Sequence, residues 1–172
     1  MRIGLAGTMS VGKTTLARAL GELDQFKDHS IQTERSKYLR DLGIPLNTDS
    51  TLRGQFVFLA ERASELLLDN IITDRTIWDV CSFTLSAKSI SDYEKRDFVT
   101  AAMHLRDYYD LVIYVSPRGV SMEDNGVRET DLGYRMKIDQ VIRLSLAEFS
   151  PKRLIEVEGT TDERIATILQ NM

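Results

Sequence analysis

One short segment constrains the fold more than any other: residues 7–14, GTMSVGKT, directly behind the apolar run of residues 3–6. Two glycines separated by four residues and followed by Lys-Thr form the phosphate-binding loop pattern. Glycine allows the backbone dihedrals that turn several N–H groups toward one anion without a Cβ penalty. An apolar stripe at residues 16, 19 and 20 predicts a helix after the loop, and helix N-termini attract anions. The segment therefore predicts a strand, a phosphate-binding loop and a helix in succession.

The residue types in this loop indicate a nucleoside triphosphate with magnesium. Lys13 supplies a mobile positive charge for the β- and γ-phosphates, and Thr14 supplies a hard oxygen ligand for Mg²⁺. We expect ATP and Mg²⁺ as cofactors. The residues predicted to contact ATP here are Gly7, Met9, Ser10, Val11, Gly12, Lys13, Thr14 and Thr15.

Apolar runs alternate with helical patterns along the rest of the chain. Strands are predicted at residues 2–6, 29–33, 70–73, 111–115 and 153–157. Alternation of this kind indicates parallel βαβ units, so we expect an α/β fold in which helices cover both faces of a five-stranded parallel sheet. Residues 1–172 are expected to form a single domain, with no linker or repeat.

Two kinds of helix signal are specific enough to test. Asp49 or Ser50 is predicted to cap a long helix that continues to Leu68, and residues 56, 59, 60, 63 and 67 are predicted to be its buried stripe. Capping-box patterns, a hydroxyl residue with Glu three positions on, predict helix starts at residues 91 and 160.

Ligands of parallel sheets bind beyond the carboxyl ends of the strands, which makes the charged residues there candidates. Asp74 is predicted to bind Mg²⁺ or accept a proton, although it could instead cap the following helix. Arg75 is predicted to stabilise a phosphate or the transition state, the alternative being an ion pair with Asp79. Glu34 is predicted to be a catalytic base or a clamp for a sugar hydroxyl; otherwise it is a solvated glutamate.

Residues 117–135 are predicted to form a lid with Arg118, Arg128 and Arg135. Arginines on a flexible loop can close over phosphates and exclude water. Arg128 is the preferred catalytic arginine of this lid, and Arg118 is predicted to contact ATP. The residues predicted to bind the acceptor are Glu34, Arg35, Gln55, Arg62 and Asp79, with Gln55 able to read a base edge or to be a plain surface residue.

Composition narrows the class of protein. A net charge of −4 argues mildly against a long nucleic-acid track. No apolar run reaches the roughly 20 residues needed to cross a bilayer. The single cysteine, Cys81, cannot form an internal disulfide, and the phosphate loop begins at residue 7, so a cytoplasmic protein with no membrane partner is expected.

Several segments together resemble a known family. The phosphate loop, Thr33-Glu34-Arg35, residues 72–79 (ITDRTIWD) and residues 124–131 (DNGVRETD) resemble the NadR-type P-loop ATPase/kinase family of bacteria and phages, which is close to nucleoside and nucleotide kinases. The resemblance implies a P-loop kinase fold.

A looser similarity to deoxynucleoside kinases implies that Glu34 is catalytic, that Gln55 reads the base, and that the Asp74-Arg75 pair and lid arginines act on phosphates. The chain departs from that pattern at Asp74, where those kinases have Glu, and at Arg35, where they have Pro.

These observations predict transfer of the ATP γ-phosphate to a deoxynucleoside or deoxynucleoside monophosphate. One alternative acceptor is DNA, through a 5′ hydroxyl or a hydroxymethyluracil base, in a groove bordered by Trp78, Arg40 and Lys37. Another alternative is an NTP-binding regulatory ATPase with no acceptor. The sequence makes no prediction of oligomeric state.

Overall fold

A five-stranded parallel sheet is the centre of the computed structural model, which describes residues 1–33, 35–120 and 132–172. The strands lie in the order β2-β3-β1-β4-β5. Their bounds are β1 Arg2–Ala6, β2 Ser30–Gln32, β3 Ile71–Asp74, β4 Leu111–Val115 and β5 Leu154–Val157. The register pairs Leu5 of β1 with Asp74 of β3 and with Ile113 of β4. The loops that follow the three central strands therefore emerge side by side.

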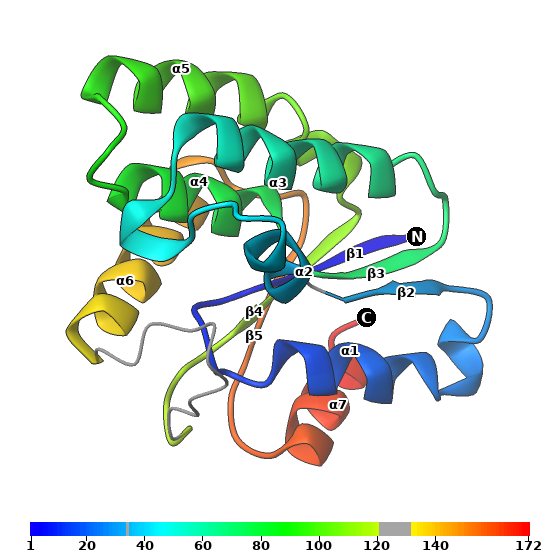
Figure 1. Ribbon diagram of the computed structural model, residues 1–172. Helices are drawn as coiled ribbons and strands as arrows, with labels where there is room; N and C mark the ends of the chain where they lie inside the picture. The colour runs from blue at the N-terminus through cyan, green and yellow to red at the C-terminus, as the bar shows by residue number, and fades with distance from the viewer. Residues whose placement is uncertain (34, 121–131) are drawn as a thin grey trace.

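Helices cover both faces of the sheet, as the sequence predicts (Figure 1). Helices α1 (Lys13–Gly21) and α7 (Thr161–Gln170) lie together on one face. Helices α3 (Leu52–Glu65), α4 (Ile77–Ser86) and α6 (Leu132–Glu148) lie on the other, and α5 (Asp92–Met103) packs on α4 farther from the sheet. The short helix α2 (Ser36–Asp41) follows β2, and single 3₁₀ turns occur at η1 (Asp24–Phe26), η2 (Asn47–Asp49) and η3 (Arg106–Tyr108).

Each face of the sheet has its own buried apolar cluster. The α1/α7 side contains Leu16 and Ile168, and the α3–α6 side contains Trp78 and Ile138. The five residues of β4 are all buried and form a continuous apolar run, because both faces of a parallel sheet are covered. No helix among the described residues is both long and apolar enough to traverse a lipid bilayer.

The predicted stripe of α3 is confirmed at Leu59, which is buried in the core, and is wrong by one residue at its two ends. Phe56 and Leu67 are exposed by 47% and 79%, whereas the positions one before them, Gln55 and Leu66, are buried. A shift of one residue rotates a helix by about 100°, so a different face meets the protein. The buried face of α3 includes Arg62, which donates to Glu65 inside the protein. A pattern of apolar residues cannot predict that face, because it takes no account of polar side chains that are buried with hydrogen-bond partners.

Both predicted capping boxes are confirmed. Ser91 and Glu94 start α5, and Thr160 and Glu163 start α7. The cap of α3 differs from the prediction: Thr51, not Asp49 or Ser50, accepts the N–H of Gly54, and the helix ends at Glu65 rather than Leu68. Asp49 and Ser50 cannot cap α3 because Asp49 is part of the turn η2 and Ser50 is the C-cap of that turn.

Candidate active site

The phosphate loop has the backbone conformation that its glycines predict. Gly7 and Gly12 have φ values of 151° and 84°, and Ser10 between them has 57°. A Cβ on Gly7 would lie 2.7 Å from the carbonyl oxygen of Val115, so only glycine fits beside β4. Gly12 is the N-cap of α1, which places the open N-terminus of that helix at the end of the loop. This arrangement can bind a phosphate through backbone N–H groups.

Lys13 and Thr14 follow at once on the first turn of α1. The Lys13 side chain is buried and folds back over the loop, where Nζ donates to the carbonyl oxygens of Gly7 and Thr8 at 2.6 and 2.8 Å. The Thr14 hydroxyl donates to the carboxylate of Asp74. Thr15, also predicted to contact ATP, is exposed on the same turn.

The donor set at Thr14 and Asp74 fits magnesium. Mg²⁺ takes hard oxygen ligands, and in phosphate sites it is bound by one or two protein oxygens together with phosphates and water. A hydroxyl and a carboxylate held in contact beside the phosphate loop are such ligands. The described part of the chain contains no group of three or more acidic, His or Cys side chains that could hold a metal ion, and a site of this kind requires none.

At the end of β3 the side chains of Asp74 and Arg75 point to different helices, Asp74 to α1 and Arg75 to α4. Asp74 is the last strand residue, 2% exposed, with its carboxylate toward Thr14. It does not cap the next helix, because Thr76 does so in a capping box with Asp79. Arg75 has a φ of 115°, a conformation that costs energy outside glycine, and its guanidinium lies 4.7 Å from the centroid of the Phe83 ring. The unusual backbone at Arg75 turns two successive charged side chains to different places.

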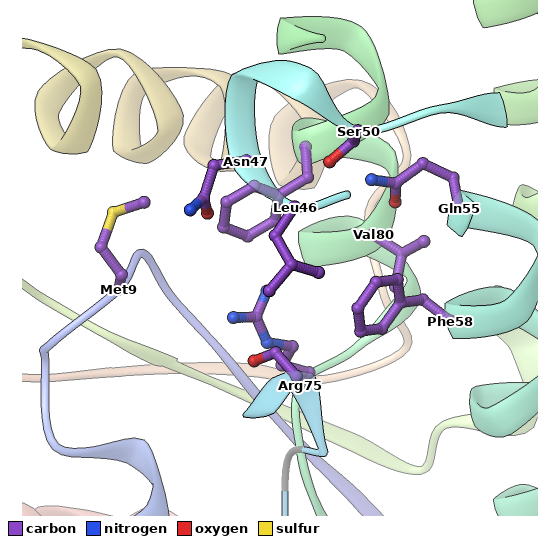
Figure 2. A pocket seen from close by; sticks show the side chains of 10 residues that line it. Met9, Leu46, Asn47, Ser50, Gln55, Phe58, Arg75 and Val80 are labelled. Atoms are coloured by element: carbon purple, nitrogen blue, oxygen red, sulfur yellow. The ribbon is translucent and has the colours of Figure 1, made fainter. Parts of the chain in front are cut away.

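A pocket opens next to the loop on the α3/α4 side, and we call it the Gln55 pocket (Figure 2). The empty space between its walls, counted out into the open solvent at its mouth, is about 470 Å³. Figure 2 shows Gln55 reaching in from α3, Arg75 from the end of β3 and Met9 from the phosphate loop. The lining residues are Met9, Ser36, Leu46, Asn47, Ser50, Gln55, Phe58, Arg75, Val80 and Phe83.

Gln55 is the most informative residue of this pocket. Its side chain is 2% exposed, and none of the residues that the structure describes forms a hydrogen bond with its amide. An amide that faces a pocket offers two donors and one acceptor to a ligand with complementary groups. Apolar side chains of Phe58, Val80 and Phe83 surround it, as in sites for flat, partly apolar ligands.

Two residues predicted to bind the acceptor instead have partners inside the protein. Arg62 is 3% exposed; it donates to Glu65 at 2.6 Å and to the backbone oxygen of Asp74 at 3.3 Å. Asp79 is fully buried and accepts from the N–H of Gly7 at 3.0 Å and from the N–H and hydroxyl of Thr76. Both residues thus connect pieces of the site to one another, and their binding to an acceptor stays a prediction.

Burial also changes the acidity of Glu65, the partner of Arg62. Loss of solvent raises the pKa of the Glu65 carboxyl to about 7, although the positive charge of Arg62 acts in the opposite direction. This group therefore titrates near neutral pH in the folded protein.

The remaining predicted residues lie at the periphery or outside the described chain. Arg35 is exposed, 3.6 Å from Glu61, and Arg118 is exposed, 3.4 Å from Glu158. Glu34, Arg128 and most of the predicted lid fall outside the described residues. The pocket residues Asn47, Ser50, Phe58 and Phe83 were not predicted, since nothing in their local sequence marks them.

Comparison with known proteins places this architecture in a family. Residues 2–164 match the model of the AAA domain family (AAA_28). The chain belongs to this family. No curated protein sequence matches it significantly. The sequence-based resemblance to P-loop NTPases is thereby confirmed, while the narrower NadR-type assignment stays a prediction.

Solved structures share the fold at low sequence identity. Deoxyadenosine kinase from M. mycoides with bound dCTP superposes with a TM-score of 0.68 at 18% identity, covering 99% of this chain and 98% of the kinase. NadR in complex with NAD and AMP-PNP gives 0.71 at 14%, covering 98% of this chain but 48% of NadR. The YorR protein of Bacillus subtilis, in complex with phosphorylated GDP, gives 0.58 at 16%, covering 99% and 95%. The chain therefore has the fold of the P-loop kinases.

Proposed function

We propose that this protein transfers the γ-phosphate of ATP, with Mg²⁺, to a deoxynucleoside or deoxynucleoside monophosphate. The observation that carries the proposal is the Gln55 pocket, in which the amide of Gln55, apolar walls and the arginine Arg75 lie next to the phosphate loop. A nucleobase has both a π-face and paired hydrogen-bonding groups, so it complements these features. The nucleotide ligands of the structurally similar kinases support the same class of acceptor.

In the proposed reaction the acceptor oxygen attacks the γ-phosphorus, and the bond from that phosphorus to the β–γ bridging oxygen breaks. ADP leaves with the electron pair, and the acceptor's proton passes to a carboxylate. The loop amides and Lys13 hold the donor phosphates, while Arg75 and Arg128 stabilise the charge that develops. Thr14 and Asp74 would hold Mg²⁺, which would supply positive charge to the phosphate oxygens.

The contact between Asp74 and Thr14 favours different roles for the two candidate bases, Asp74 and Glu34. A carboxylate already turned toward the phosphate loop is placed for the metal. We therefore assign the metal to Asp74 and the proton to Glu34. Glu34→Gln should abolish turnover with ATP binding retained, whereas Asp74→Asn should also weaken the Mg²⁺ dependence of nucleotide binding.

The test of the acceptor class is ADP release from ATP and Mg²⁺ across a panel of acceptors. The panel contains deoxynucleosides, deoxynucleoside monophosphates, nicotinamide riboside, and DNA with and without hydroxymethyluracil, with Lys13→Ala as the blank. Stimulation by one nucleoside or nucleotide supports the proposal. Stimulation by DNA alone would replace it with a polynucleotide kinase, and ATP binding without any acceptor would replace it with a regulatory ATPase. Trp78, expected to border a DNA groove, is fully buried and donates to the carbonyl of Phe149.

Gln55→Leu tests the pocket itself. Loss of paired hydrogen bonds to a base should raise KM for the acceptor by about 100-fold or more, with KM for ATP unchanged. Gln25→Leu, an exposed glutamine on η1, is the matched control. Equal acceptor KM values for Gln55→Leu and wild type would contradict a base-reading pocket.

A further inference from the structure

Two buried arginines contact successive carbonyl groups of the phosphate loop. Arg164 of α7 donates from Nη1 to the carbonyl of Val11 at 2.7 Å, and Arg135 of α6 donates from Nη2 to the carbonyl of Ser10 at 3.4 Å. They are 4% and 5% exposed. The two helices lie on opposite faces of the sheet, so the loop is contacted from both sides (Figure 1).

A contact at a carbonyl fixes the N–H on the other side of the same peptide unit. The peptide group is planar and trans, with its C=O and N–H directed oppositely. Holding the carbonyl of Val11 toward the protein therefore directs the N–H of Gly12 away from it, toward the side where α1 begins. Phosphate-binding loops work by directing consecutive N–H groups to one anion.

The charge of Arg164 is not neutralised within the described chain. No carboxylate in residues 1–33, 35–120 and 132–172 forms an ion pair with it, and its Nε is buried without a hydrogen-bond partner. Burial lowers the pKa of its guanidinium, a sign of how much hydration the group has lost. Its Nη1 would lie 3.1 Å from a Cβ placed on Gly12, so this charge sits directly against the phosphate loop.

We infer that Arg164 is a positioning residue of the phosphate site: it holds the Val11–Gly12 peptide with its N–H toward the polyphosphate and adds a buried positive charge that the bound anion compensates. The inference rests on the phosphate-binding part of the proposed function and is independent of the acceptor. A buried cation is expensive without an anion, and a bound polyphosphate supplies one.

Equilibrium binding to the full-length protein tests this. Arg164→Met should weaken binding of ATP, ADP and inorganic tripolyphosphate alike, by about 10- to 100-fold, because one charge-assisted contact and one charge are lost. Arg164→Lys keeps the positive charge but lacks the planar guanidinium, so its affinity for these ligands should lie between those of Arg164→Met and the wild type. Arg153→Met is the matched control, since Arg153 also donates to backbone carbonyls, those of Asn171 and Met172, at the far end of α7.

The variants also separate positioning from folding. Arg164→Met should raise KM for ATP more than it lowers kcat, since it removes binding shared by ground and transition states. Unchanged affinity for tripolyphosphate in Arg164→Met would overturn the inference while leaving phosphoryl transfer intact. If circular dichroism shows that Arg164→Met does not fold, Arg164→Lys decides: wild-type affinity in that variant overturns the positioning role. A negative acceptor panel, by contrast, would sink the kinase proposal without altering these binding constants.

Discussion

The buried pair formed by Arg62 and Glu65 gives a prediction whose size can be worked out. Arg62→Met removes a guanidinium that is 3% exposed and leaves a carboxylate that is 12% exposed without its 2.6 Å partner. Removing one member of a buried ion pair costs about 3–5 kcal/mol. For a domain of this length, about 3 kcal/mol corresponds to a fall in Tm of roughly 6–12 °C.

The loss should depend on pH. Burial raises the pKa of Glu65 to about 7 from 4.5, so the folded protein binds a proton that the unfolded chain releases. The stability that Glu65 contributes through this bound proton is therefore fully present below pH 4.5 and is lost as the pH rises through 7. Without Arg62 the carboxyl should hold its proton to higher pH still, because the attractive charge is gone. The stability gap between Arg62→Met and wild type should then be wider at pH 8 than at pH 5.

Thermal unfolding without nucleotide at these two pH values is the assay. The double variant Arg62→Met with Glu65→Leu should regain most of the loss at pH 8, since neither member of the pair is left buried without its partner. Arg106→Met, which breaks the exposed contact with Asp107, should change Tm by less than about 3 °C. A Tm within 2 °C of wild type for Arg62→Met at pH 8, or an equal loss at both pH values, would refute the reasoning.

Two further predictions concern stability alone. Gly4→Ala should destabilise by about 1–3 kcal/mol or more, because its Cβ would lie 2.6 Å from Cγ2 of Thr76 and 2.7 Å from the Tyr109 ring; urea unfolding measures this, and wild-type stability would contradict it. Ser91→Ala should cost about 1 kcal/mol in the same assay through loss of the capping box with Glu94, with an unchanged urea midpoint as the opposing result.

The sequence predicted what depends on local spacing. The phosphate loop, the alternation of strands and helices and two capping boxes are each encoded within a few consecutive residues, and all lie where they were expected. A rule about strand ends, which needs only the order of elements, was enough to name Asp74 as a candidate, and the structure has the Thr14 hydroxyl donating to its carboxylate.

The Gln55 pocket could not be predicted in the same way, because η2, α3, β3 and α4 each contribute part of its wall. Charged residues were a second source of error. Arg62 is buried, while average exposure places arginine at the surface, and only its internal partners explain the difference. The two ends of the predicted α3 stripe were wrong for this reason.

The division of the core by the sheet has a consequence for how such a protein can change. The loop spans both layers, with Met9 in the α3–α6 cluster and Val11 in the α1/α7 cluster. Substitutions far apart and without shared partners act almost independently. The α3–α6 layer, which carries the Gln55 pocket, can therefore be remodelled by natural drift or by an engineer while the α1/α7 layer keeps its packing. Met9 is the residue through which such remodelling would reach the phosphate loop.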